Sequence, residues 1–88
     1  MATAQRLDSA EDAGRHMGRE AVDAGEITAS TDADSLHSIA LRRASKGTLN
    51  CGLTYNFEGD RACFVAFYYG FTAFALYWRK DNSVQIPR

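Results

Sequence analysis

Two histidines and two cysteines are the residues of this chain whose side chains most often bind zinc. They are His16, His37, Cys51 and Cys63. Zinc ligands usually occur as closely spaced pairs, with two to five residues between the members. None of these four residues forms such a pair with another. We therefore expect two buried thiols, two surface imidazoles, and neither a metal nor another cofactor.

A nucleophilic active site needs a serine or cysteine beside a base that a third group orients. Asp34, Ser35 and His37 are close in sequence, but Ser35 and His37 would not face each other on a helix. The Ser-Lys-Gly segment at 45–47 lacks the preceding glycines of a phosphate-binding loop. The sequence therefore predicts a protein that is not an enzyme and has no small-molecule substrate.

The chain is organised around residues 62–78, a run of 17 residues without a charge. Crossing a bilayer takes about 20 mostly apolar residues, with a lower limit near 17. A single-pass membrane peptide that spans 62–78 is therefore one alternative. Tyr68, Tyr69 and Gly70 in the middle of the run argue against it, because tyrosine prefers the membrane interface. We expect no membrane contact, and the aromatic content favours β-strands.

Charge is distributed unevenly along the 88 residues. Residues 1–34 hold eight acids and three bases, for a charge of −5, and residues 35–88 hold seven bases and three acids, for +4. Such an asymmetry concerns partners and association rather than fold. The first residues show no apolar segment of a signal peptide, and two cysteines are too few for a disulfide scaffold. A reducing, cytoplasmic location is the expectation.

We predict a single domain over residues 1–88, with a flexible arm at 1–7 and two helices within 8–46. Asp8 or Ser9 can cap the first helix, and Gly25 is suited to end it in a left-handed conformation. Gly14 and Gly18 lower the intrinsic stability of that helix. They are expected to admit a neighbouring backbone instead. The second helix is expected to end near Lys46 and Gly47.

Residues 48–86 are predicted to form an antiparallel sheet. Apolar residues alternate with polar ones from Leu49 to Phe57, which indicates a strand with one buried face. Further strands are expected over 61–68 and 71–80, joined at Tyr69-Gly70, with a short edge strand over 84–86. The predicted fold is α+β: an N-terminal helical hairpin packed on one face of a three- or four-stranded antiparallel sheet. In this register Val65, Phe67, Phe74, Leu76 and Trp78 lie beneath the helices.

Two helices can cover only one side of such a sheet. The opposite side would expose Phe64, Tyr68, Phe71 and Tyr77. At about 150–250 Å² for each aromatic, this face would exceed the largest patch of a typical monomer, roughly 300–600 Å². It is therefore predicted to bind a protein partner or a second copy in a homodimer. Helices on opposite faces of the sheet, or strands bent into a barrel, would remove the exposed face.

Single-stranded nucleic acid is the second candidate partner. Aromatics on a sheet, with basic residues nearby, provide stacking and phosphate contacts. The basic residues are Arg42, Arg43, Lys46, Arg61, Arg79 and Lys80. Residues 64–67 (Phe-Val-Ala-Phe) resemble the end of the RNP1 segment of RRM domains. The Gly-aromatic-Gly that precedes it in RRM domains is absent, and two helices before three strands is not the RRM order. The net charge of −1 also opposes contact with phosphates.

The prediction is a non-enzymatic binding protein. Its expected partner-binding residues are Phe64, Tyr68, Phe71, Tyr77, Arg42 and Arg43. In size and in the lack of catalytic motifs, the chain resembles small phage-encoded inhibitors of bacterial defence, anti-CRISPR proteins among them. This resemblance covers no particular residues. It implies an inhibitor or an immunity-type protein that acts by protein–protein contact.

Overall fold

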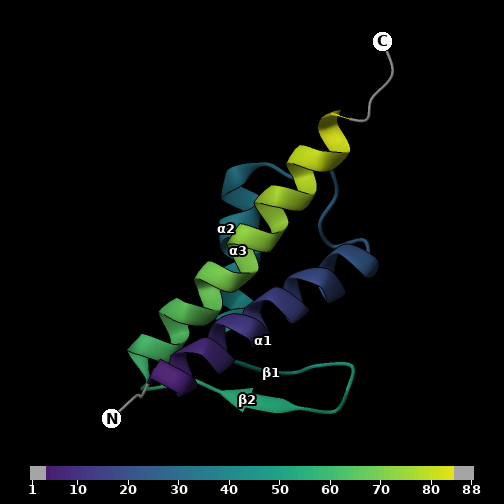
Figure 1. Cartoon of the computed structure of the whole chain (residues 1–88). Helices are drawn as coiled ribbons and strands as arrows, with labels where there is room; N and C mark the ends of the chain where they lie inside the picture. The colour runs from purple at the N-terminus through teal and green to yellow at the C-terminus, as the bar shows by residue number, and fades with distance from the viewer. Residues whose placement is uncertain (1–3, 85–88) are drawn as a thin grey trace.

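The computed structural model describes residues 4–84 and is mainly helical over that range. A long first helix is followed by a shorter helix, a small hairpin and a second long helix (Figure 1). The elements are α1 (Ala4–Asp23), α2 (Ala33–Ala44), β1 (Lys46–Thr48), β2 (Thr54–Asn56) and α3 (Arg61–Val84). The two long helices lie together near their N-terminal ends and diverge toward their C-terminal ends (Figure 1).

The predicted strands over 61–68 and 71–80 are wrong, because these residues form the single helix α3. Its N-terminus is capped by Asp60, whose Oδ1 accepts a hydrogen bond from the Cys63 N–H at 3.2 Å. Its buried positions Cys63, Phe67, Phe71 and Ala75 recur every four residues, a helical period. Packing of that face outweighs the β preference of the individual aromatics. Within residues 4–84, no helix is both long enough and apolar enough to cross a bilayer.

The single strand predicted from Leu49 to Phe57 is also wrong. This segment forms the turn and second strand of a hairpin, in which Gly47 pairs with Tyr55. Gly52 has a φ of +92°, a conformation that glycine adopts without strain. The hairpin is therefore a two-stranded sheet, and the rest of the predicted sheet at 48–86 is absent from the described residues. Of the predicted edge strand at 84–86, Val84 is the last residue of α3, and 85–86 lie outside the described residues.

The N-terminal half follows the prediction more closely. Two helices lie within residues 4–44, and Gly25 ends the first of them with a φ of +78°. Asp32 caps α2, because its Oδ1 accepts a hydrogen bond from the Ser35 N–H at 2.7 Å. Residues 4–7 of the predicted arm belong to α1, which begins at Ala4, and residues 1–3 lie outside the described range. The prediction that Asp8 or Ser9 caps the first helix is wrong, because both lie inside α1. α2 ends at Ala44, before the predicted Lys46 and Gly47.

Glycines bring the backbones of α1 and α3 into direct contact. A Cβ atom on Gly14 of α1 would lie 2.1 Å from the carbonyl oxygen of Phe67. A Cβ atom on Gly70 of α3 would lie 2.0 Å from the carbonyl oxygen of Glu11. No side chain fits at either position. The expectation that Gly14 admits a neighbouring backbone is confirmed, and Gly70, predicted as part of a turn, has the same role from the opposite helix.

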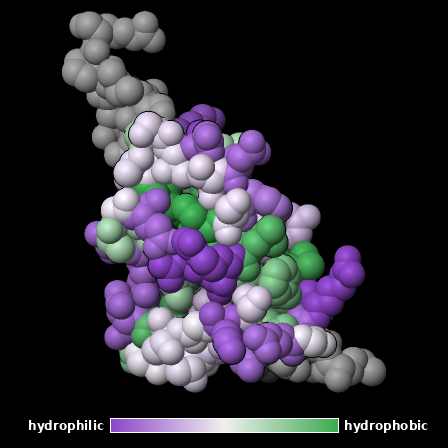
Figure 2. Space-filling view, turned by 180° about the vertical axis from the view of Figure 1, so that it is seen from behind, coloured by the Kyte–Doolittle hydropathy of each residue, from purple (hydrophilic) through white to green (hydrophobic). Residues whose placement is uncertain are grey.

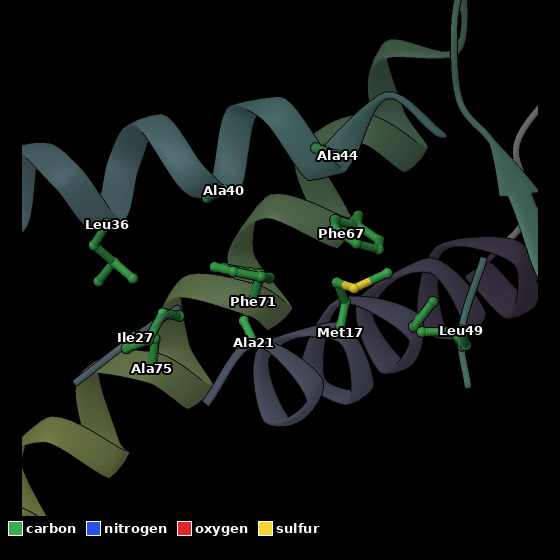
Figure 3. Close-up of a cluster of buried hydrophobic side chains, with 11 residues drawn as sticks. Met17, Ala21, Ile27, Leu36, Ala40, Ala44, Leu49, Phe67, Phe71 and Ala75 are labelled. Carbon is green, nitrogen blue, oxygen red and sulfur yellow. The ribbon is translucent and has the colours of Figure 1, made fainter. Parts of the chain in front are cut away.

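The core forms where α2 crosses the paired long helices. Phe67 and Phe71 of α3 are fully buried and lie between the small residues of α2 and the apolar face of α1 (Figure 3). Ala40 and Ala44 of α2 are also fully buried. Their small side chains let α2 approach the phenylalanine rings closely. One face of α3 is thus covered by its own chain.

Candidate functional site

The face of α3 directed away from the core is apolar and exposed. Four large side chains stand on it: Tyr77 (71% exposed), Tyr69 (63%), Leu76 (52%) and Val65 (39%). Val65, Tyr69 and Leu76 lie four and seven residues apart, which is the spacing of one helix face, and Tyr77 follows Leu76 directly. Together with their small neighbours and one terminal cation we call this surface the outer face of α3. It consists of Ala62, Val65, Ala66, Tyr69, Ala73, Leu76, Tyr77 and Lys80.

A groove hollows the outer face near the N-terminal end of α3. It has a volume of about 720 Å³, and Leu7 and Glu11 of α1 form its second wall. The wall on α3 consists of Arg61, Ala62, Val65, Ala66 and Tyr69. Nearer the C-terminal end, a shallower hollow of about 320 Å³ is lined by Ala73, Leu76, Tyr77 and Lys80. The outer face therefore has both recesses and protruding side chains, as contact surfaces between proteins do.

The aromatic residues predicted to share one exposed face are separated by the helix. Phe71 is fully buried, and Phe64 and Tyr68 are partly buried against the core, whereas Tyr77 is exposed. Tyr68 also contacts α2, because its hydroxyl lies 2.5 Å from Nδ1 of His37. A helix directs residues 64, 68 and 71 inward and 77 outward. Only Tyr77 of the predicted aromatic set lies on the outer face of α3.

Three residues of the outer face were not predicted as partner-binding. Val65 and Leu76 were expected in the core, and Tyr69 was expected in a turn. All three assignments depended on a period of two, which places alternate residues on one side. At the helical period the same residues fall on the side opposite Phe67 and Phe71. A four-residue repeat of Val65, Tyr69 and Ala73 was the signal in the sequence that could have identified them.

Arg42 and Arg43, predicted to bind a partner, both contact Glu26 of the loop after α1. Arg43 forms an ion pair through its terminal nitrogen and donates from Nε to Glu26 Oε1 at 3.2 Å. Arg42 donates to the same oxygen at 3.0 Å. Glu26 is only 23% exposed. These contacts connect α2 to the end of α1, so a structural role accounts for both arginines without a partner.

The pKa of Glu26 is shifted by this pairing. The hydrogen bond from Arg43 lowers it below the usual 4.5, against the opposing effect of partial burial, and the remaining contacts with the two arginines lower it further. Because the folded-state pKa lies below the unfolded one, the pairing stabilises the fold above the unfolded pKa. That stabilisation is lost as the pH falls through the lowered folded pKa.

Glu26→Gln should therefore lower the free energy of unfolding at pH 7 by about 1–2 kcal/mol. The difference from the wild type should shrink between about pH 5 and about pH 3, as the wild-type carboxylate becomes protonated. Urea unfolding at several pH values measures both effects. Glu58→Gln is the matched control. Glu58 forms an ion pair with Lys46 at 3.6 Å in which both side chains are exposed, so its replacement should change the free energy of unfolding little. A constant difference across the pH range would contradict the pairing.

A second cavity lies between α1 and the turn of the hairpin. It has a volume of about 530 Å³ and brings His16, Asp12 and Cys51 to one surface. Glu20, on the same side of α1, accepts a hydrogen bond from the Asn50 N–H at 2.8 Å and so fixes the turn. Asp12 is paired with Arg15 at 2.5 Å. Glu20 thus holds the hairpin turn to α1, and Asp12 pairs within α1.

The four candidate zinc ligands do not converge. His16 and Cys51 border the cavity at the hairpin, His37 lies on α2, and Cys63 is buried in the first turn of α3. Among the residues that the structure describes, no three histidine, cysteine or acidic side chains are placed to hold a metal ion. Cys51 is exposed as a free thiol, in contrast to the expectation that both thiols are buried, and Cys63 is buried.

Hydrophilic and apolar residues are mixed on the side of the molecule turned away in Figure 1, where a hydrophilic band runs across the middle between apolar patches (Figure 2). No family model, curated protein or solved structure matches this chain. Of the six large hydrophobic side chains that are exposed in the described part of the chain, four stand on the outer face of α3.

Proposed function

We propose that this protein is a non-enzymatic binding protein whose outer face of α3 contacts another protein chain. The observation that supports the proposal is the exposure of four large apolar side chains on one face of a helix whose other face forms the core. Water contact at such a contiguous surface is unfavourable, and a partner that covers it gains the free energy of burial.

Nucleic acid has less support as the partner. Phosphate binding requires cationic groups that are available to neutralise the chain. Three of the six cations predicted nearby are in ion pairs: Arg42 and Arg43 with Glu26, and Lys46 with Glu58. Phe67 and Phe71 are buried and cannot stack on bases. The exposed Tyr69 and Tyr77 belong to a helix whose outer face otherwise carries alanine, valine, leucine and a single cation, Lys80. This composition matches a protein contact better than a stacking platform.

Position-specific photo-cross-linking in the native host tests the proposal. A benzophenone side chain is placed at Tyr69 or at Tyr77, and the adducts are resolved by mass after irradiation. Leu53 on the hairpin is the control, because it is 57% exposed but lies away from α3. We expect discrete adducts from positions 69 and 77 and only background from position 53. Background from all three positions, or equal adducts from 53, would overturn the proposal.

A further inference from the structure

We propose that a second copy of this chain occupies the outer face of α3, with the two α3 helices antiparallel and residue 71 of each level with residue 71 of the other. The inference deepens the proposed function and rests on it. In this arrangement Tyr69 of each copy packs over Ala73 of the other. The groove beside α1 receives Tyr77 of the second copy. Three features of the outer face support this arrangement over others.

The first feature is a match of large and small residues. The twofold axis lies between the two helices at the level of residue 71. It therefore pairs a residue before position 71 in one copy with a residue equally far after position 71 in the other, to within one residue. Tyr69 then faces Ala73, Tyr77 faces Ala66, and Val65 faces Leu76. Each exposed tyrosine meets an alanine, which is the condition for close contact between two helices.

The second feature is that the same register satisfies both edges of the outer face. In an antiparallel pair related by a twofold axis, each edge of a helix meets the same edge of its copy. At 3.6 residues per turn, Ala66 and Tyr77 lie on the edge of α3 next to Gly70, which contacts α1. Val65 and Leu76 lie on the opposite edge. Both facing pairs therefore form at once, and the Ala66 edge is the one at which α1 deepens the groove.

The third feature is charge at the two ends of the outer face. Glu11 and Arg61 border the groove at one end, and Lys80 borders the hollow at the other. Antiparallel packing brings Lys80 of one copy beside Ala62 of the other, where Glu11 offsets the charge of Arg61. Glu11 already pairs with Arg15 at 3.2 Å through Oε1, and its second oxygen can accept Lys80. Parallel packing would place the two Lys80 side chains together and the two Arg61 side chains together, so charge favours the antiparallel direction.

The size of the outer face sets the expected affinity. A helix of 24 residues is about 36 Å long, and a single helix–helix contact of this length buries less than the roughly 800 Å² per partner of a standard interface. We therefore expect a reversible dimer with a dissociation constant on the order of micromolar. Sedimentation at about 100 µM should show a mass near twice the 9.7 kDa of the chain.

Disulfide trapping tests the register in a Cys51→Ser background, which removes the exposed thiol while Cys63 stays buried. Ala66→Cys/Tyr77→Cys and Val65→Cys/Leu76→Cys each place cysteines on one edge. The two positions of a pair lie 11 residues apart in one helix, about 16 Å, so a disulfide must join two copies. Val65→Cys/Leu76→Cys keeps Tyr77 in place, so the test does not depend on one variant.

Under mild oxidation both double variants should form a disulfide dimer, in at least about tenfold greater yield than the single variant Leu76→Cys. In the antiparallel register the two Leu76 positions are offset by ten residues, about 15 Å, so Leu76→Cys would cross-link to itself only if the helices were parallel. Greater yield from Leu76→Cys would overturn the antiparallel register. A 9.7 kDa mass at every concentration, with no trapping, would overturn the dimer itself. Photo-adducts with a different protein would then leave the proposed function standing, and their absence would remove both.

Discussion

Gly14→Ala is expected to lower the free energy of unfolding by about 2–4 kcal/mol, although alanine favours a helix over glycine by about 1 kcal/mol. The new Cβ would lie 2.1 Å from the carbonyl oxygen of Phe67 and 2.9 Å from the backbone nitrogen of Phe71. Neither atom can move unless α3 moves as a whole. The two long helices must separate, and the packing around Phe67 is lost along the contact.

Gly18→Ala is the matched control, one turn further along the same helix. Its Cβ would lie 3.1 Å from Cδ1 of Phe74, a side-chain atom, and 3.3 Å from the carbonyl oxygen of Phe71. A ring can shift by a few tenths of an ångström, so the loss should stay below about 1 kcal/mol after the gain in helix propensity. Chemical denaturation of both variants measures the difference. Equal stabilities would mean that α1 and α3 are not in backbone contact at Gly14.

Phe71→Ala and Tyr77→Ala should have very different effects, although both remove an aromatic ring from α3. Phe71 is fully buried, with its ring centroid 6.5 Å from that of Phe67, and its loss leaves a cavity that costs about 3–5 kcal/mol. Tyr77 is exposed, so its loss should change the stability of the dilute monomer by less than about 0.5 kcal/mol. A sheet with both rings on one open face would instead give similar, small effects.

Thermal unfolding of both variants at low concentration measures this contrast, and the low concentration keeps self-association out of the comparison. A destabilisation by Tyr77→Ala as large as that by Phe71→Ala would contradict the inward and outward assignment of the two rings. A small effect of Phe71→Ala would contradict the core itself.

The two N-terminal helices could be predicted from the sequence because their signals are local. Gly25 acts as a terminator within a few residues of the end of the first helix. The close approach at Gly14 was also foreseeable from its cost to an isolated helix. Its contact partner was not foreseeable, because it lies in α3, more than 50 residues away in sequence.

The C-terminal half was mispredicted because two periods compete in it. β-Branched and aromatic residues favour strands locally, and Tyr69-Gly70 suggested a turn. The inward-facing aromatics nevertheless follow alternating spacings of three and four, the helical signature. They are Phe64, Phe67, Phe71, Phe74 and Trp78. Gly70 breaks no helix here, because contact with α1 compensates for its low propensity.

The candidate site was only partly predicted for the same reason. That the C-terminal half carries more apolar surface than the helices cover follows from composition, and exposed Tyr77 was assigned to that surface. The neighbours of Tyr77 depend on the period, so Phe71 was placed on that surface in error and Leu76 was omitted. Arg42 and Arg43 were assigned to a partner because the sequence gives no local sign of their contact with Glu26. Glu26 lies 16 and 17 residues away, in a different part of the fold.

The yield of photo-adducts from Tyr77, divided by the yield from Leu53, tests the central claim most directly. The two side chains are comparably exposed, at 71% and 57%, so unspecific collisions contribute to both. A protein that functions through the outer face of α3 should give a ratio of at least about ten. A ratio near one would show that this face meets solvent and nothing else.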